Sequence, residues 1–192
     1  MKEHILTEQG TEYLQQKDYE KAMKCYLKAA EEGDYFAMYN IACMYYFGDG
    51  LEKDMRNAFL WYCRASDAGD PEGASHAGSM CEQGQGTEQD LKRAFHYYKI
   101  AAERNSLAGM AYAGLCLAEG KGTNVSVDEG LAWLNKASEG GNGAASVLLG
   151  DWARDGIHMP RSRDKAIEYY NRGVEQKYDP AAERLRALSP EE

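Results

Sequence analysis

Basic side chains are too few in this sequence to balance its acidic ones. Its 192 residues contain 22 Lys and Arg against 31 Asp and Glu, a formal net charge of -9. Binding of nucleic acid depends on clustered basic residues that displace counterions from phosphates, and anionic membrane surfaces also attract basic residues. The charge balance therefore argues against nucleic acid and against an anionic membrane surface as partners.

Long apolar runs are absent as well. No segment approaches the about 20 apolar residues that a membrane-spanning helix needs. An acidic residue, Glu3, stands near the start, where a signal peptide would carry its apolar stretch. We therefore expect a cytoplasmic protein that does not insert into membranes.

The cysteines form no metal-binding or disulfide pattern. There are five, an odd number, and no Cys-x-x-Cys pair or histidine at ligand spacing accompanies them. They are Cys25, Cys43, Cys63, Cys81 and Cys116. We interpret them as reduced thiols that pack as small apolar groups, and we predict no metal or other cofactor.

What the sequence does contain is an internal repeat of 36 residues. Small residues recur at this period in two columns, and a large side chain stands between them. The columns are Ala22, Ala58, Ala94, Gly130 and Ala166; Tyr26, Tyr62, Tyr98, Leu134 and Tyr170; and Ala29, Ala65, Ala101, Ala137 and Gly173. Spacings of four and three place these side chains on one face of a helix.

Each unit also carries start and stop signals for two helices. Candidate N-caps precede the second helix, which ends near glycine or asparagine, and glycine pairs end the first helix. The N-caps are Asp18, Asp54, Asp90, Ser126 and Ser162; the second-helix ends are Gly33, Gly69, Asn105 and Gly141; and the first-helix ends are Gly48 with Gly50, Gly84 with Gly86, Gly120 with Gly122, and Gly156 alone. Each N-cap is expected to contribute about 1 kcal/mol.

These signals predict an all-α protein, a right-handed α-solenoid of stacked helix-turn-helix repeats. One such hairpin cannot bury its apolar face alone, so neighbouring copies must stack. We predict a single domain over residues 1–192 with units at about 3–36, 37–72, 73–108, 109–144 and 145–180. A polar-faced closing helix is expected at about 181–189, with Glu183, Arg184 and Arg186 exposed.

The column order resembles that of the Sel-one-like repeat (SLR), a branch of the tetratricopeptide repeat superfamily. The second unit shows this pattern as Ala37, Tyr45, Gly48, Gly50, Asp54, Ala58, Trp61, Tyr62, Ala65 and Gly69. The first unit has a turn four residues shorter and resembles an ordinary tetratricopeptide repeat instead. The resemblance covers nearly the whole chain.

The family resemblance implies a binding role, and we predict a protein-protein interaction adaptor or scaffold that binds a peptide or protein segment in a concave groove and is not an enzyme. Two alternatives stay open: a self-assembling structural scaffold, and a hydrolase related to the beta-lactam-binding, cysteine-rich branch. The cysteines here do not recur by unit, which sets this chain apart from that branch.

In related arrays the first helix of each unit lines the groove, and its exposed positions can be transferred through the repeat register. They are Phe36, Tyr39, Cys43, Tyr46 and Phe47 in the second unit; Glu72, Ser75, Ser79, Glu82 and Gln83 in the third; Ala111, Leu115 and Glu119 in the fourth; and Val147, Asp151, Arg154 and Asp155 in the fifth. His76 is added as a hydrogen-bonding contact. Tyr39 and Tyr46 are the leading candidates, because aromatic side chains are frequent interface anchors.

Structural alternatives compete with these assignments. The aromatic residues could instead pack against the preceding unit, and the acidic ones could be solvated surface. The lysine and asparagine clamp by which some tetratricopeptide proteins hold a carboxylate is missing, since Thr7 and Thr11 take its first-unit positions and Glu72 stands where a cation is needed. The expected partner is therefore a segment with apolar and basic residues.

One catalytic motif, Ser162-x-x-Lys165, needs an alternative explanation. This spacing supplies a nucleophile and a nearby base in some serine acyltransferases. Here the serine falls in the N-cap column of the repeat, so a structural role is favoured. The four histidines, at positions 4, 76, 96 and 158, lie in unrelated columns, and we predict no catalytic site.

Overall fold

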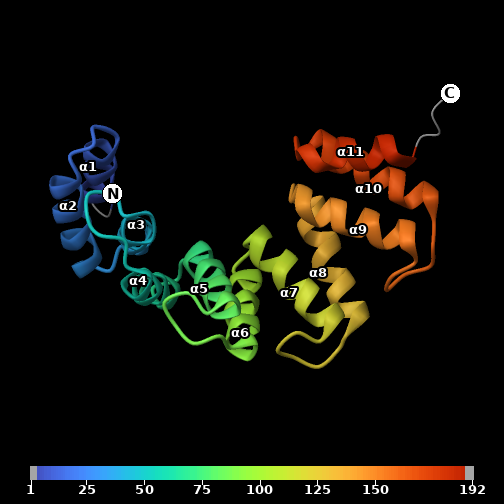
Figure 1. The fold of residues 1–192 in the computed structure, drawn as a ribbon. Coiled ribbons are helices and arrows are strands. Elements are labelled where there is room, and N and C mark those ends of the chain that lie inside the picture. Colours follow the sequence, from blue (N-terminus) through green and yellow to red (C-terminus); the bar gives the residue numbers. More distant parts are fainter. Residues whose placement is uncertain (1–3, 189–192) are drawn as a thin grey trace. The chain divides into compact units, whose positions relative to one another are not determined.

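The computed structural model describes residues 4–188, which form eleven α-helices and no β-strand (Figure 1). The helices are α1 (Ile5–Gln15), α2 (Tyr19–Glu31), α3 (Tyr35–Phe47), α4 (Met55–Asp67), α5 (Pro71–Gln83), α6 (Leu91–Glu103), α7 (Leu107–Glu119), α8 (Val127–Glu139), α9 (Gly143–Asp155), α10 (Arg163–Glu175) and α11 (Asp179–Leu188). The prediction of an all-α helix-turn-helix repeat is confirmed. Residues 3 and 189, where the first unit and the closing helix were expected to begin and end, lie outside the described residues.

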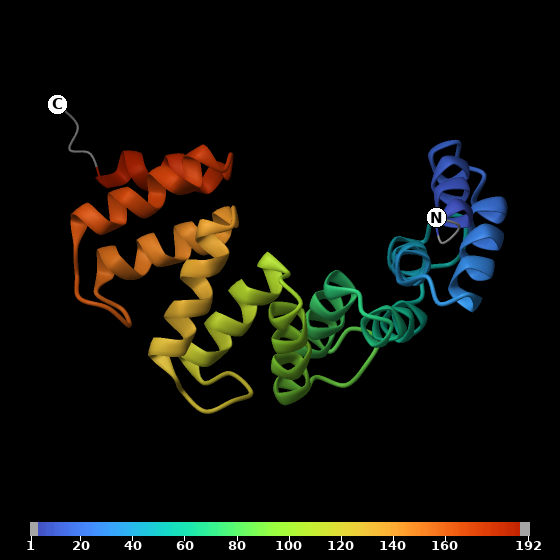
Figure 2. The ribbon, with the colours of Figure 1, turned by 180° about the vertical axis from the view of Figure 1, so that it is seen from behind.

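Consecutive helices pack against each other along the chain. The two helices of one hairpin are in contact, as in α3 with α4 and α9 with α10, and consecutive hairpins are in contact at α2 with α3, at α4 with α5 and at α8 with α9. Loops of seven residues join the helices within a hairpin from the second hairpin onward, and Figure 2 shows them from behind. These loops hold the glycine pairs that the sequence placed at the ends of the first helices.

The chain divides into two compact units with the boundary between Ala101 and Ala102, here called unit 1 and unit 2. In unit 1, Ala22, Tyr26 and Ala29 of α2 pack with Ala37 and Ile41 of α3, and all five are at most 2% exposed. Ala22, Tyr26 and Ala29 belong to the predicted columns. The small-large-small columns therefore form the core by contact between neighbouring hairpins.

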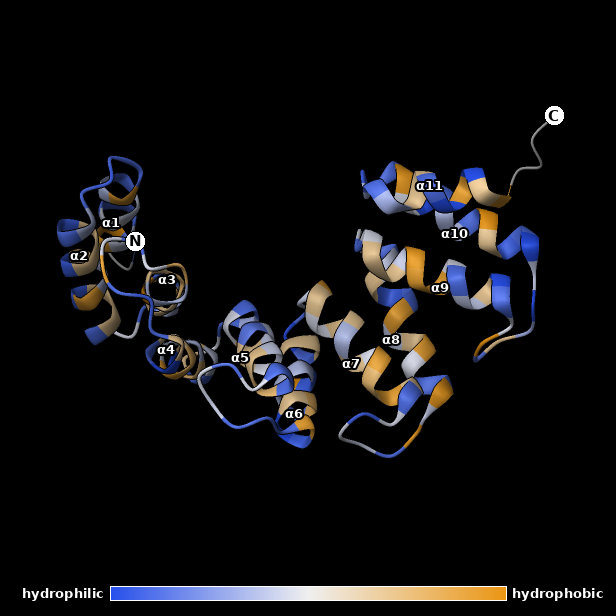
Figure 3. Ribbon diagram, viewed as in Figure 1, coloured by the Kyte–Doolittle hydropathy of each residue, from blue (hydrophilic) through white to orange (hydrophobic). Residues whose placement is uncertain are grey.

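In unit 2, the corresponding core joins α9, α10 and α11. Ala166 and Tyr170 of α10 pack with Val147 of α9 and Ala181 of α11, and Leu185 lies partly buried against them. Glu183, Arg184 and Arg186 are exposed on α11, as predicted. Figure 3 shows apolar and polar residues together on helices such as α2, α9 and α10, as expected of amphipathic helices. Within residues 4–188, none of the helices has both the length and the apolar composition needed to cross a membrane.

A close approach between the two helices of a hairpin explains one glycine column that the sequence analysis did not use. A Cβ atom on Gly78 of α5 would lie 2.7 Å from ring atoms of Tyr98 on α6, and one on Gly150 of α9 would lie 2.5 Å from the ring of Tyr170 on α10. Such distances are too short for a carbon-carbon contact. Glycine at these positions lets the tyrosine ring lie directly on the neighbouring backbone.

The N-cap predictions are correct at four of the five positions. The side chains of Asp18, Asp54 and Ser162 each accept a backbone N–H at the start of the second helix, and Asp90 does the same for Lys92 and Arg93. Ser126 precedes α8, but its side chain forms no capping hydrogen bond. Ser126 takes the predicted N-cap position of α8, and only the expected side-chain hydrogen bond is wrong, since the position does not ensure the side-chain orientation that capping needs.

A second set of caps was missed. Asp34, Asp70, Ser106 and Asn142 precede the first helices of their hairpins, and each accepts backbone N–H groups of the first helical turn. Each stands directly after the residue at the end of a second helix, where the chain takes a left-handed conformation. One short turn thus ends one helix and starts the next.

The left-handed positions follow the repeat even where glycine is missing. Gly33, Gly69 and Gly141 have positive φ, and so do Asn105 (φ 66°) and Lys177 (φ 57°) in the same column. His158 (φ 56°) takes the place of the second glycine of the last loop, where the sequence showed Gly156 alone. The register of the fold therefore determines backbone conformation at these sites more strongly than the residue type does.

Candidate partner-binding site

Helix α3 carries most of the predicted aromatic contacts, and its start is held by a buried carboxylate. Asp34 accepts the N–H groups of Phe36 and Ala37 through one oxygen, and through the other it accepts the Thr7 hydroxyl at 2.6 Å and contacts the His4 ring at 2.9 Å. Burial by itself raises the pKa of Asp34, but these hydrogen bonds outweigh burial and hold the pKa below its ordinary value. The N-terminal end of α3 is thereby fixed against α1.

The predicted stripe of α3 lies on one helix face and is partly open to solvent. Phe36 is 46% exposed and Phe47 is 66% exposed, while Tyr39, Cys43 and Tyr46 are half-buried. Phe36 contacts the rings of His4 and Tyr35, and Phe47 contacts Tyr46 edge-on. The two phenylalanines thus pack against neighbours on one side and remain accessible on the other.

Tyr39 belongs to a three-ring cluster contributed by α3, α4 and α5. The His76 ring of α5 stacks on Tyr62 of α4 with centroids 4.8 Å apart and planes 12° from parallel. The Tyr39 hydroxyl lies 3.2 Å from Nε2 of His76, and its ring is 5.6 Å from each of the other two. Sequence reasoning found Tyr39 and His76 but not their contact, and it assigned Tyr62 to the core alone.

The cluster is uncharged at neutral pH. Burial lowers the pKa of His76 below its ordinary value of 6.5, although the nearby carboxylates of Glu72 and Asp70 oppose this shift. Burial also raises the pKa of Tyr39 and of Tyr62. A neutral imidazole between two neutral phenols leaves an amphipathic surface, with apolar ring faces and a hydrogen-bonded edge.

Several residues predicted to contact a partner instead form hydrogen bonds with the hydroxyl groups of core tyrosines. The Tyr62 hydroxyl lies 3.4 Å from Sγ of Cys43, the Tyr98 hydroxyl donates to Glu82 at 2.7 Å, and the Tyr170 hydroxyl donates to Asp151 at 2.8 Å. In the first hairpin, Tyr26 and Thr11 form the same kind of pair at 3.1 Å. The fourth hairpin has Leu134 in the tyrosine column and Leu115 on the facing helix.

This pairing supplies a structural role for Cys43, Glu82 and Asp151 that the sequence analysis did not consider. Their side chains satisfy buried phenols of the adjacent helix. Burial raises the pKa of the Cys43 thiol, which keeps it protonated and able to share a hydrogen with the phenol. These residues lie at the predicted positions but are already engaged within the chain.

Two positions expected to be exposed are buried. Ser75 is 5% exposed and donates its hydroxyl to the backbone carbonyl of Pro71 at 3.2 Å. Val147 is 7% exposed and packs in the core between α9, α10 and α11. The expectation that they face a partner was wrong, because the face of a helix that neighbouring helices cover depends on how closely those helices pack.

The remaining α5 positions are accessible to different degrees. Glu72 and Gln83 are exposed at the two ends of the helix, and Ser79 is half-buried with its oxygen accepting from Gln83 Nε2 at 2.9 Å. Glu72 therefore brings an accessible negative charge to the helix that also carries His76.

In unit 2, the charged residues that were predicted to bind a partner form ion pairs with one another and with α11. Arg154 pairs with Asp155 at 2.6 Å and with Asp151 at 3.1 Å, and Arg184 of α11 also pairs with Asp151 at 3.1 Å. The hydrogen bond to Asp155 raises the pKa of Arg154 above its ordinary range. Between α7 and α9, Ala111 and Leu115 line a small, mainly apolar pocket of about 190 Å³.

The candidate catalytic groups do not come together. Ser162 accepts the backbone N–H of Lys165 at 3.3 Å, the bond expected of an N-cap. His96 contacts the Tyr97 ring and His158 contacts the Trp152 ring, and neither of these contacts involves Ser162. Among residues 4–188, no group of three or more His, Cys, Asp or Glu side chains is arranged to hold a metal ion.

Solved structures similar to this chain are bacterial repeat proteins. A Sel1 repeat protein from Oxalobacter formigenes is 27% identical, with a TM-score of 0.85 over 93% of this chain and 73% of that one. The protein c5321, described as a protective antigen of uropathogenic Escherichia coli strains with an SLR fold, is 26% identical, with a TM-score of 0.87 over 97% of this chain and 41% of that one.

A third similar structure is the immunity protein Pa5087 from Pseudomonas aeruginosa. It is 25% identical, with a TM-score of 0.60 over 91% of this chain and 68% of that one. A search of the curated proteins found no match.

The family comparison agrees with the repeat found in the sequence. Sel1 repeats are matched at residues 6–34, 36–70, 71–106, 107–142 and 143–178. The matched units begin close to the starts of α1, α3, α5, α7 and α9 and each contains one hairpin. The chain therefore belongs to the Sel1 repeat family.

Proposed function

We propose that this protein is a non-enzymatic interaction adaptor that holds a segment of another protein on a surface of α3 and α5. We define this α3–α5 surface by Phe36, Tyr39 and Tyr46 of α3 with Glu72 and His76 of α5. The observation that carries the proposal is the accessible aromatic stripe of α3, because large aromatic side chains left open to solvent often anchor a partner. Ser79 and Glu82 extend the surface along α5.

The charge of the surface favours a partner with basic and apolar residues. Glu72 is exposed beside the ring cluster, and the ammonium group of Lys53 lies 5.5 Å from the centre of the Tyr46 ring. This contact of Lys53 supports a role for the Tyr46 ring in packing against a cation. The chain as a whole carries a net charge of -9, which speeds association with basic segments.

The neutral ring cluster supports the same function. A hydrogen-bonded set of rings from three helices presents a fixed shape, so binding costs little side-chain entropy. Asp151 and Arg154 take the corresponding positions in unit 2, and we propose them as secondary contacts. We further propose that all five units belong to one binding domain, and we place the protein in the cytoplasm because its five cysteines are unpaired thiols.

The relatives are consistent with an interaction role. One solved relative is called an immunity protein and another a protective antigen. These names support an interaction role for the fold. They do not identify the partner of this chain.

A peptide array tests the proposal. Peptides that alternate aromatic or aliphatic residues with Lys or Arg are compared with versions carrying Glu at the basic positions, and with scrambled versions. We expect binding to the basic set and at least about a tenfold loss of affinity for the Tyr39→Ala, Tyr46→Ala double variant. Circular dichroism checks that the variant keeps its helices.

Leu60→Ala provides a matched control, since Leu60 is an exposed apolar residue of α4 outside the α3–α5 surface, with 47% exposure. It should bind as the wild type does. Preference for the acidic peptides, or unchanged affinity in the double variant, would show that the α3–α5 surface is not the binding site.

A further inference from the structure

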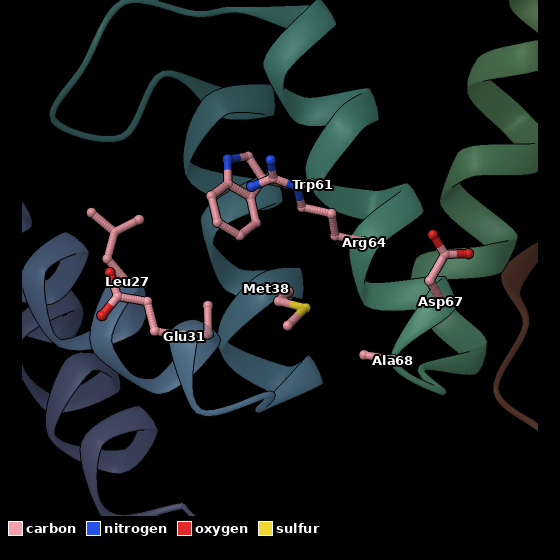
Figure 4. A pocket seen from close by; sticks show the side chains of 8 residues that line it. Leu27, Glu31, Met38, Trp61, Arg64, Asp67 and Ala68 are labelled. Atoms are coloured by element: carbon pink, nitrogen blue, oxygen red, sulfur yellow. The ribbon is translucent and has the colours of Figure 1, made fainter.

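A hollow between α2 and α4 is lined by side chains that do not belong to the α3–α5 surface. Its volume is about 600 Å³, and Figure 4 shows Met38 of α3 between the side chains of α2 and those of α4. Leu27 and Trp61 contribute large apolar surfaces, and Ala30 and Ala68 are small. A pocket of this size with an apolar lining and few polar groups is typical of a site that takes a ligand side chain. We call it the α2–α4 pocket.

The same positions in unit 2, three repeats further along, are filled. Ala30, Met38 and Ala68 correspond to Ser138, Ser146 and Gln176. The Ser138 and Ser146 hydroxyls lie 2.7 Å apart, and Ser146 donates to Gln176 Oε1 at 2.8 Å. Gln176 Nε2 in turn donates to the backbone carbonyl of Ser138 at 2.6 Å. A long polar side chain and two hydroxyls therefore close the α8–α10 interface.

Unit 1 lacks the atoms that close this interface. Ala68 stands where Gln176 extends its side chain, and Ala30 stands where Ser138 supplies its hydroxyl. The Ala30 carbonyl accepts the Gly33 N–H at 3.1 Å, just as the Ser138 carbonyl accepts the Gly141 N–H at 3.2 Å. In unit 2 that carbonyl accepts a second donor, from Gln176, and a carbonyl oxygen has two lone pairs to do so. The repeat thus leaves an acceptor in unit 1 for an N–H donor supplied from outside.

Negative charge borders the pocket. Glu31 is the last residue of α2 and Asp67 is the last residue of α4, so both carboxylates stand where a helix dipole is also negative. Neither one forms an ion pair with another of the residues 4–188. The pocket's basic residue, Arg64, turns its guanidinium over the Trp61 ring at 4.5 Å, as Figure 4 shows. Two carboxylates and two helix C-termini together favour a cation.

We propose that the α2–α4 pocket binds an arginine or lysine side chain of a partner protein. The aliphatic stem of that side chain lies on Met38 and Leu27, and its charged head takes the place that the Gln176 amide has in unit 2. There it donates to the Ala30 carbonyl and pairs with Glu31 or Asp67. A basic side chain fits because it combines an apolar stem with a donor head.

This inference is independent of the proposed function of the α3–α5 surface. The two sites use different helices, apart from Met38, and different side chains. An adaptor with both sites could hold two segments at once.

Titration of the protein with three peptides tests the proposal. The peptides are acetyl-Leu-Arg-Leu-amide, the same sequence with citrulline, which keeps the shape of arginine without its charge, and the same sequence with glutamate. The Trp61 indole N–H signal, assigned from its loss in Trp61→Phe, reports binding in NMR spectra. We expect a saturable shift with the arginine peptide and at least a fivefold weaker affinity for the citrulline peptide.

Variants locate the site. Ala30→Ser with Ala68→Gln introduces the counterparts of Ser138 and Gln176 and should fill the pocket, abolishing the shift while the helical content stays unchanged. Glu31→Gln with Asp67→Asn should lower the affinity for the arginine peptide to that measured for the citrulline peptide. Glu139→Gln, at the end of α8, is the matched control and should bind normally, as should Tyr39→Ala with Tyr46→Ala.

Four results would overturn the proposal. The first is equal affinity for arginine and citrulline peptides, and the second is no saturable shift with any peptide. The third is preference for the glutamate peptide, which would make Arg64 the ligand-binding group. The fourth is concentration-dependent dimerisation that the Ala30→Ser, Ala68→Gln variant abolishes, which would assign the pocket to a second copy of this chain.

Discussion

The core tyrosines of the second helices differ mainly in what their hydroxyl groups contact. Tyr98 donates to a carboxylate at 2.7 Å, while Tyr62 lies 3.4 Å from a thiol. A hydrogen bond to a charged acceptor is stronger than one to sulfur. The contribution of each tyrosine hydroxyl to stability therefore depends on which residue the facing helix places opposite it.

This difference predicts unequal effects of removing the hydroxyl. Tyr98→Phe should lower the free energy of unfolding by about 1 to 2 kcal/mol, because Glu82 loses a donor. Tyr62→Phe should cost less than about 1 kcal/mol, since sulfur is a weak partner. Urea denaturation of both variants measures the difference. Equal losses would mean that the hydroxyl contacts do not govern the stability of this column.

The lowered pKa of His76 predicts that the stability of the protein depends on pH. The His76 pKa is lowered in the folded protein by burial, so between its ordinary value of 6.5 and the lower folded value the unfolded chain binds more protons. Stability should therefore fall as the pH drops from about 7 through 6.5 toward the folded pKa. The groups facing the ring are Tyr39, Tyr62, Glu72 and Asp70.

His76→Phe keeps a ring for stacking but removes the titration. The slope of the unfolding free energy between pH 7 and 5 should be shallower in this variant than in the wild type. An NMR titration of the His76 ring should give a midpoint below 6.5. A wild-type slope in His76→Phe would show that other groups control stability in this range.

At the scale of helices, the repeat signals predicted much of the fold. Glycine and asparagine positions located helix ends, and the 36-residue columns identified the buried faces of α2, α4, α6, α8 and α10. The caps of α3, α5, α7 and α9 were missed because one residue there both follows a helix end and precedes a helix start. Serine at position 126 suggested a capping hydrogen bond, but the residue type alone does not determine whether the side chain points toward the backbone N–H groups.

Two serines at N-cap positions of unit 2 allow a matched test. Ser106 is 3% exposed and accepts the Gly109 N–H at 3.1 Å, whereas Ser126 forms no capping bond. Ser106→Ala should cost about 1 kcal/mol of unfolding free energy, and Ser126→Ala should stay within about 0.5 kcal/mol of the wild type. Thermal and urea unfolding give both values. A larger loss for Ser126→Ala would contradict the capping assignment.

At the scale of the whole molecule, stability in a stacked repeat comes from contacts between neighbouring hairpins. The last hairpin packs against α11, where Ala181 and Leu185 cover Val147 and Tyr170. The stability of α9 and α10 should therefore depend on a helix that is nearly all polar on its other face.

Ending the chain after residue 178 tests this dependence. Removal of α11 should expose the core of the last hairpin and lower the protection of α9 and α10 amides from hydrogen exchange by at least about tenfold. The amides of α2 and α3, which lie in unit 1, are the internal control and should keep their protection. Unchanged protection in α10 would show that the last hairpin is stable without α11.

The sequence by itself determined the helical hairpin, its period and the residues of the core, because these follow from spacing and from the backbone preferences of glycine and capping residues. The tertiary structure decided which surface residues are available. Ser75 and Val147 are buried, and Cys43, Glu82 and Asp151 hold tyrosine hydroxyls. The α2–α4 pocket also appears only in three dimensions, since it arises where Ala30 and Ala68 stand at positions that the repeat three units further along fills with Ser138 and Gln176.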